Sequence, residues 1–170
     1  MEIMVVLGII AILSGIAIPS ILSSRSNAQL RSASQDVYLG LQKARATAIK
    51  RNVNCGIVFN QTLSGKTYDY VVFLDSNANM VFDVGSETVL EKKKLSDNGG
   101  VRLDTSQGGG NGVDFVNGSG DPAFYFSTDG FPKYSMTSPA WGSVYLTDHR
   151  EGKTRIEVTA AGNIKVIRTS

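Results

Sequence analysis

The chain has 170 residues, 42% of them hydrophobic, which is enough for one ordinary domain with a real core. Its formal net charge of +2 is too small to exclude any class of function. The single cysteine, Cys55, excludes an internal disulfide. The charge is unevenly distributed. Residues 23–52 carry six basic side chains and one acid, Asp36, whereas residues 53–170 carry eleven basic and thirteen acidic side chains.

The first stretch, residues 1–22, is strongly apolar. Residues 3–18 contain no charge, and Ile21 and Leu22 continue the apolar character past Pro19. A bilayer core of ~30 Å needs ~20 apolar residues at 1.5 Å each, so the stretch is just long enough to span a membrane as a helix. Glu2 is the exception, because an ionisable group in such a helix is costly and is usually paired.

Two simpler interpretations fit this stretch less well. A signal peptide needs a basic start and a small-residue cleavage site, whereas the leading charge here is negative. A plain signal anchor needs neither an acid at its tip nor the internal Gly8, Gly15 and Pro19, which suit a helix that flexes or packs closely.

Glu2 to Val6, followed by the run that ends in Ala17-Ile18-Pro19, resembles the N-terminal helix of type IV pilins and pseudopilins. The resemblance implies that Glu2 pairs with the N-terminal amine of a neighbouring subunit during assembly, and that Pro19 kinks the helix. Mature chains of that family begin with an N-methylated Phe. The basic leader and three residues before Met1 are absent. Either the start is truncated or misassigned, or the usual peptidase cannot process the chain, and we expect truncation.

Residues 23–52 are expected to continue the helix as an amphipathic second half. Apolar residues recur every three or four positions, at Ala33, Val37, Leu41, Ala44 and Ala48. A helix of ~50 residues would be ~75 Å long, so we expect half of it in the membrane and half in the domain. The basic face is explained either by solvation or by cytoplasmic retention under the positive-inside rule. In pilins the removed leader sets the topology instead, which favours the periplasm.

Residues 53–170 are expected to form an antiparallel β domain. Strands are predicted at 55–59, 68–74, 88–95, 101–103, 113–116, 123–127, 143–147, 155–159 and 163–168. Leu63 to Lys66 is a hairpin turn, Lys92 to Lys94 mark a charged edge, and residues 97–112 form a Gly-rich loop. The last two strands are expected to form a hairpin with Ile156, Val158, Ile164 and Val166 facing inward.

Three later stretches are similar to the GspH/FimT branch of minor pilins and pseudopilins: Lys43–Asn52, Phe126–Gly130, and the closing strand–Ala-Gly–strand. The resemblance implies an α+β, pilin-like fold in which one long helix packs on an antiparallel sheet. It also implies a non-enzymatic subunit anchored in the inner membrane, with a periplasmic domain. Its partners would be other pilins, in a type II secretion pseudopilus or a type IV pilus, and the inner-membrane assembly platform.

An alternative is a FimT-like, DNA-binding minor pilin of a competence system. Lys153, Arg155, Lys165 and Arg168 are the basic residues that the alternative uses. Arg155 and Lys165 alternate with inward residues and are expected to point outward together, with Glu157 on the same side. The region has no aromatic residues for base stacking, and its acids dilute the charge, so we expect weak binding.

One loop is a candidate for binding a structural Ca²⁺ ion. No other cofactor is expected. Oxygen-bearing side chains alternate along it, at Asp75, Asn77, Asn79, Asp83 and Glu87. An EF-hand loop wants Gly at its sixth position and Glu at its twelfth, which are Met80 and Ser86 here. An ordinary Asx-rich turn explains the same residues.

Catalysis has little support in the sequence. The single histidine, His149, lies among charged residues in a loop and is interpreted as part of a polar turn. Cys55 lies in an apolar strand and is interpreted as a small core residue.

Overall fold

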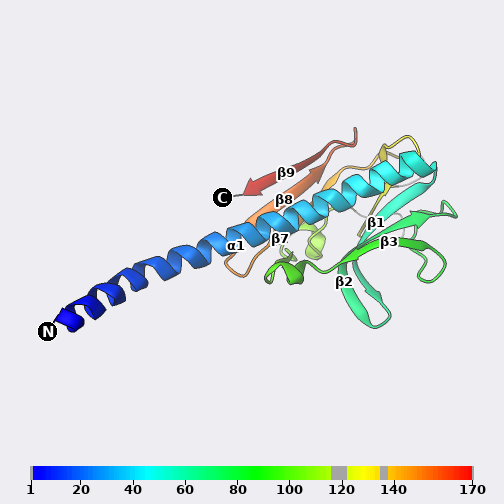
Figure 1. Ribbon diagram of the computed structural model, residues 1–170. Coiled ribbons are helices and arrows are strands. Elements are labelled where there is room, and N and C mark those ends of the chain that lie inside the picture. Colours follow the sequence, from blue (N-terminus) through cyan, green and yellow to red (C-terminus); the bar gives the residue numbers. More distant parts are fainter. Residues whose placement is uncertain (1, 116–121, 135–137, 170) are drawn as a thin grey trace.

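The computed structural model describes residues 2–115, 122–134 and 138–169, with backbone only at residues 2, 9, 11, 13–23 and 169. One helix, α1 (Glu2–Arg51), runs the length of the molecule, and the rest of the chain folds against its second half (Figure 1). The helix continues through Pro19 without a break in its assignment. Its first half projects away from the domain (Figure 1).

In the described part of the chain, nine strands follow the helix, and every strand pair is antiparallel. They are β1 (Asn54–Leu63), β2 (Lys66–Asp75), β3 (Thr88–Lys93), β4 (Arg102–Leu103), β5 (Ala123–Phe126), β6 (Pro132–Lys133), β7 (Gly142–Thr147), β8 (Lys153–Val158) and β9 (Ile164–Thr169). Two 3₁₀ turns, Leu95–Asn98 and Gly108–Gly110, lie on either side of β4. The α+β class is confirmed.

The strands form two sheets, in the orders β3-β2-β1-β5-β6 and β4-β7-β8-β9. We expected one sheet. The division arises because β5 pairs with β1, while β7 pairs with β4 and β8, and such long-range pairings leave no local pattern in the sequence. The predicted strand at 113–116 is also wrong in its described part, which forms only a single bridge from Val113 to Val144.

The predicted hairpin between β1 and β2 is confirmed. Leu63 pairs with Lys66, and the two turn residues, Ser64 and Gly65, have φ values of 50° and 75°. Positive φ at both central positions is typical of the two-residue turns that match strand twist. The charged edge predicted at Lys92 to Lys94 is confirmed as well, because β3 is an edge strand of the five-stranded sheet.

The main core lies between α1 and the two sheets. Ala33, Val37, Leu41, Ala44 and Ala48 are all completely buried, as the apolar stripe predicts. A second cluster, which includes Phe73 and Tyr125, covers the outer face of the five-stranded sheet. Met80 and Phe82, from the loop after β2, complete that outer cluster. The Phe73 and Phe82 ring centroids lie 4.6 Å apart.

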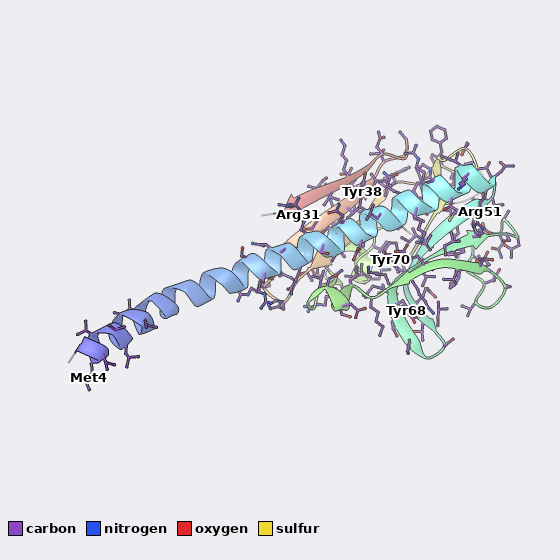
Figure 2. The ribbon with its side chains drawn as sticks, viewed as in Figure 1. Met4, Arg31, Tyr38, Arg51, Tyr68 and Tyr70 are labelled. Carbon is purple, nitrogen blue, oxygen red and sulfur yellow. The ribbon has the colours of Figure 1, made fainter. Side chains whose placement is uncertain are left out.

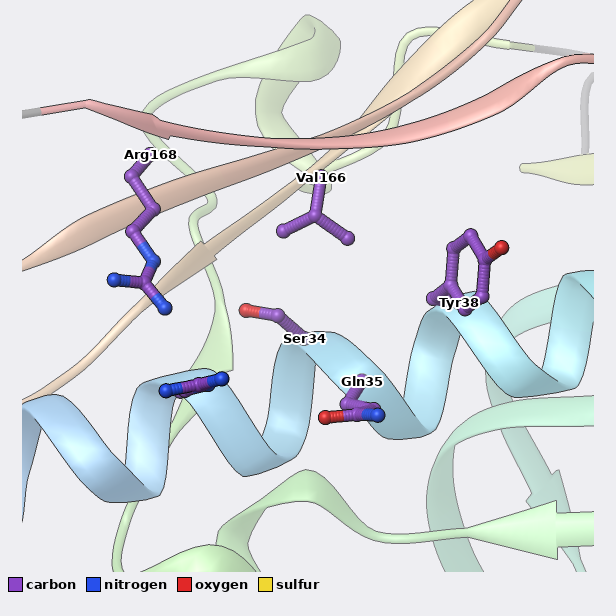
Figure 3. Close-up of a pocket in the computed structure, with 6 residues that line it drawn as sticks. Ser34, Gln35, Tyr38, Val166 and Arg168 are labelled. Atoms are coloured by element: carbon purple, nitrogen blue, oxygen red, sulfur yellow. The ribbon is translucent and has the colours of Figure 1, made fainter.

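The closing hairpin has the predicted alternation with one difference. Ile156, Val158 and Ile164 are buried, whereas Val166 remains 43% exposed. Val166 does point toward α1 (Figure 3), but the helix side chains opposite it leave a gap. Orientation along a strand therefore followed the sequence pattern, and burial depended on how closely the helix approaches β9.

Candidate functional site

The projecting end of α1 presents apolar side chains away from the domain. Met4 is 79% exposed at the free end of the helix (Figure 2). Its large apolar neighbours are exposed as well, namely Ile3, Val5, Val6, Leu7, Ile10 and Ile12. Exposed apolar surface of this extent marks a site that contacts protein or lipid. Glu2 and Pro19 lie on this half of the helix, with backbone alone described.

Within the described residues, no helical segment combines the length and the apolar character needed to cross a bilayer.

Arg45 joins the second half of the helix to two distant turns. Its Nε donates to the Gly130 carbonyl at 3.1 Å, and its Nη1 donates to the Gly162 carbonyl at 2.9 Å. Both glycines are buried with φ near +79° and +78°. The three stretches that resemble GspH/FimT therefore meet at this one guanidinium group. The sequence did contain a signal, because Arg45 follows Leu41 by four residues and so lies on the buried stripe.

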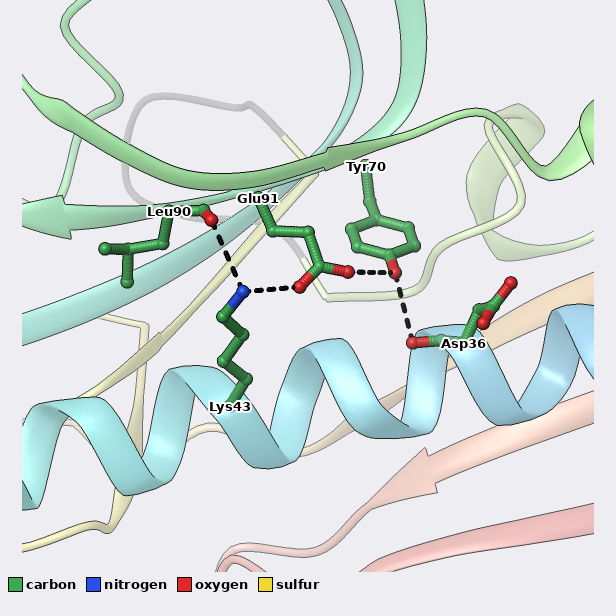
Figure 4. Close-up of polar contacts among 5 residues, drawn as sticks. All are labelled: Asp36, Lys43, Tyr70, Leu90 and Glu91. Carbon is green, nitrogen blue, oxygen red and sulfur yellow. Dashed lines mark hydrogen bonds and ion pairs between the residues drawn. The ribbon is translucent and has the colours of Figure 1, made fainter.

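A polar network fastens β2 and β3 to the helix (Figure 4). Lys43 pairs with Glu91 at 2.7 Å, and the Tyr70 hydroxyl lies 3.1 Å from both Glu91 Oε1 and the Asp36 carbonyl. Gly40 makes room for this ring, since a Cβ there would lie 3.0 Å from Tyr70 Cε2. Burial, and then the charge of Glu91, raises the pKa of Tyr70, so the phenol stays protonated.

A second polar contact ties the helix to the loop between β7 and β8. The buried Ser26 hydroxyl donates to Asp148, which also accepts from the backbone N–H groups of Arg150 and Gly152 at 2.9 and 2.8 Å. Burial raises the pKa of Asp148, but these hydrogen bonds outweigh it and hold the pKa below its ordinary value. His149 lies beside this carboxylate in the turn, consistent with a structural loop.

The loop from Asp75 to Glu87 folds on its own side chains. The carboxylate of Asp75, which is 1% exposed, accepts from the N–H groups of Asn79 at 3.2 Å and Met80 at 3.1 Å. The Asn77 and Asn79 amides both donate to Asp83 Oδ2, at 2.9 and 2.8 Å. Those two amides hold the pKa of Asp83 below its ordinary value.

Glu87 closes this loop. Its Oε2 accepts from the Asp83 N–H at 3.2 Å, while its Oε1 is buried without a hydrogen-bond partner. Burial, with the charges of Asp75 and Asp83, raises the pKa of Glu87 to about 7. Among the described residues, no three acidic, His or Cys side chains converge closely enough to form a metal site by themselves.

The four cations considered for DNA binding do not share one surface. Glu157 pairs with Lys165 across β8 and β9, and Arg155 pairs with Ile167, so Arg155 and Lys165 do lie on one face. Arg168 is opposite the buried Thr154 and reaches toward α1 instead (Figure 3). Two of the others are also paired with acids, since Lys153 lies 3.1 Å from Asp104 and Arg155 lies 3.4 Å from Glu157.

An open groove of about 290 Å³ separates α1 from β9 (Figure 3). It is lined by Arg31, Ser34, Gln35, Tyr38, Val166 and Arg168. The Ser34 hydroxyl donates a hydrogen bond to the Leu30 carbonyl, and the Tyr38 hydroxyl accepts one from the Gln42 amide. The groove holds no arrangement of nucleophile and base.

Cys55 is a core residue, as the sequence indicated. Its side chain is completely buried, and its thiol donates to the Phe73 carbonyl at 3.0 Å. Burial raises the pKa of this thiol to about 12, which leaves it unreactive at neutral pH.

Comparison with known proteins agrees with this architecture. The family model described as type II transport protein GspH matches residues 33–162. The pilin-like protein PilA1 of Thermus thermophilus is 34% identical over 105 residues, which cover 61% of this chain and 64% of that protein. The aligned part is therefore slightly less than two thirds of the relative's length. No solved structure matches the chain.

Proposed function

Because the chain belongs to the GspH family of type II transport proteins, we propose that it is a non-enzymatic minor pilin or pseudopilin. In this proposal it assembles through its N-terminal helix, beside other pilin-like subunits, into a type II secretion pseudopilus or a type IV pilus. Glu2 pairs with the terminal amine of a neighbouring subunit, and Pro19 lets the helix bend to fit the filament. Mature family members carry a methylated N-terminus, and the same modification is proposed here.

The observation that carries the proposal is the unequal environment of the two halves of α1. The second half is buried in the β domain through residues such as Val37 and Leu41. The first half has no domain beside it, and its described large apolar side chains are exposed by 52% or more (Figure 2). Leaving these side chains in water costs roughly 1.5–3 kcal/mol each relative to burial. An assembly partner or a lipid phase removes that cost.

The proposal divides the chain into three parts. Residues 1–22 form the membrane and filament-core helix, residues 23–52 the amphipathic half that carries the domain, and residues 53–170 the β domain. Before assembly, the chain is a single-pass protein of the inner membrane with its domain in the periplasm, near the assembly platform. After assembly it is part of the filament.

Fractionation of the native host tests this location. We expect the 170-residue chain to stay in the inner membrane through alkaline carbonate extraction. That treatment releases proteins held by charge contacts, whereas an inserted apolar helix is held by the hydrophobic effect. Protease added to spheroplasts should digest the domain, whereas a cytoplasmic marker should survive. Recovery of the chain in the soluble cytoplasm would overturn the proposal.

DNA capture by the closing hairpin is the second proposal that the family leaves open. Lys165 supports it, since no ion pair involves it within the described chain and it shares a face with Arg155. Neutralisation of Lys153 and Arg155 by acids speaks for weak binding, as does the position of Arg168 on the opposite face.

We expect duplex DNA to bind the detergent-solubilised chain with a dissociation constant above ~10 µM at physiological salt, at the weak end of non-specific binding. A mobility-shift titration at several salt concentrations measures this. Submicromolar binding that is lost when Arg155 and Lys165 are both changed to Glu would instead make DNA uptake the leading function.

A further inference from the structure

The four-stranded sheet ends at a free edge. Among the described strands, β9 pairs with β8 alone, and no other described segment donates to or accepts from its backbone. Alternate residues of an edge strand direct their N–H and C=O groups away from the sheet, so β9 offers a row of unused donors and acceptors. The β3 edge of the other sheet differs, because Lys43 of α1 donates to the Leu90 carbonyl at 3.3 Å (Figure 4).

The groove between β9 and α1 lies beside this free edge. Val166 and Arg168 extend from β9 toward the helix, where Tyr38 lies opposite the strand (Figure 3). Val166 points inward yet stays 43% exposed. A second hollow of about 290 Å³ shares Arg31 and Arg168 with the groove and extends it along the helix. The inward side chains of a strand added at β9 would therefore point into this space.

The groove is positively charged. Arg31 and Arg168 are exposed, and neither takes part in an ion pair within the described chain. None of the described residues that line the two hollows is acidic. Guanidinium groups bind carboxylates and phosphates through paired hydrogen bonds. Charge complementarity therefore requires an anionic group on the ligand.

The surroundings of the two arginines select among anionic ligands. The free edge of β9 matches an extended peptide backbone, and Val166 and Tyr38 offer apolar surface next to the charge. Nucleic acid and lipid headgroups supply phosphate but no backbone that pairs with a strand. A second copy of β9 fits poorly, because the strand carries Lys165 and Arg168 and no acid, and like charges would face each other.

From the free edge and the charged groove beside it, we infer that β9 binds an extended acidic segment of a different subunit. The segment adds to the sheet as a further strand, and its carboxylate pairs with Arg31 and Arg168. Side chains on one face of a strand recur at every second residue. Val166 and Arg168 therefore specify an apolar and an acidic side chain two positions apart in the partner. That the partner is another pilin-type subunit rests on the proposed function, whereas the strand pairing does not.

A synthetic peptide tests the inference on the detergent-solubilised full chain. The probe is Thr-Val-Thr-Glu-Thr-Val-Thr-Glu-Thr, in which Val and Glu share one face when the peptide is extended. The control peptide carries Gln in place of Glu. Fluorescence anisotropy of the labelled peptides should show at least ten-fold tighter binding of the Glu peptide, because charge-assisted hydrogen bonds are roughly twice as strong as neutral ones.

Amide hydrogen exchange distinguishes strand addition from attraction to charge alone. Saturating Glu peptide should slow exchange in β9 at least five-fold, because the added strand protects the N–H groups at the free edge. Exchange in β4, the other edge of the same sheet, should not change. Binding of the peptide without protection of β9 would contradict the inferred pairing.

Reversing both charges in the groove gives a matched comparison. The double variant Arg31→Glu with Arg168→Glu should fold, because both side chains are exposed. It should lose at least ten-fold in affinity for the Glu peptide and should bind a peptide with Lys in place of Glu instead. Arg51→Glu with Arg102→Glu alters the net charge equally at two exposed arginines outside both hollows, and should bind as the unmodified chain does.

Equal binding of the Gln peptide, or undiminished binding of the Glu peptide by the double variant in the groove, would overturn the inference. Binding of duplex DNA or of phosphatidylglycerol nanodiscs that depends on these two arginines, in a chain that ignores the Glu peptide, would also overturn it by assigning them to phosphate. Membrane location is measured separately, so failure of the strand pairing and failure of the filament proposal are distinguishable.

Discussion

Replacing Arg45 with Met should lower the free energy of unfolding by ~2–4 kcal/mol, since hydrogen bonds to a charged donor contribute about 1.5–3 kcal/mol each. The guanidinium group is the donor to the Gly130 and Gly162 carbonyls. Met fills a similar space along its aliphatic part but donates no hydrogen bond. Both turns would then lose their common attachment to the helix.

Thermal unfolding followed by circular dichroism measures this loss, and we expect the midpoint to fall by ~4–16 °C. Arg51→Met is the matched control, because Arg51 is an exposed arginine near the end of the same helix. That change should alter stability by no more than ~0.5 kcal/mol. Equal midpoints for the two variants would show that Arg45 is not the attachment described here.

The second half of the helix was predictable because burial there follows a short period. Residues three and four positions apart share one helix face, and all five stripe residues, from Ala33 to Ala48, are buried against the sheets. The β1–β2 hairpin was predictable for a similar reason, since its turn is set by two adjacent residues, Ser64 and Gly65.

The division into two sheets was not predictable, because it depends on partners far apart in the chain. β1 pairs with β5 across more than fifty intervening residues, and nothing in either strand specifies the other. The Ser26–Asp148 contact has the same character. Arg45 is an intermediate case: its position on the stripe was visible, whereas its two carbonyl partners were not.

The loop from Asp75 to Glu87 was predictable only in part. Its Asx-rich turn followed from the sequence, whereas the positive φ of 56° at Met80 did not, because glycine is the residue that usually adopts that conformation. The positions of the oxygen-bearing side chains could be seen in the sequence. The burial of Glu87 Oε1 could not, since it depends on how the loop folds over β2.

Glu2→Ala should abolish assembly while leaving the domain folded and the chain in the membrane. An unpaired carboxylate within lipid or a packed helix bundle is costly. In the proposed assembly, a neighbour's terminal amine would therefore compensate the charge of Glu2 and set the register of the two helices. Alanine removes the charge and with it the specific pairing. We expect the apolar helix still to insert and the domain still to fold, because the first half of α1 projects away from the β domain (Figure 1).

The most direct measurement is the yield of crosslinked adducts between this chain and pilin-type subunits in native membranes. Glu2→Ala is compared with Ile10→Ala, a matched truncation of an exposed side chain on the same half of the helix. A filament subunit that assembles through Glu2 should lose at least ten-fold in adduct yield in Glu2→Ala and less than two-fold in Ile10→Ala. Undiminished adducts from Glu2→Ala would contradict assembly through this residue.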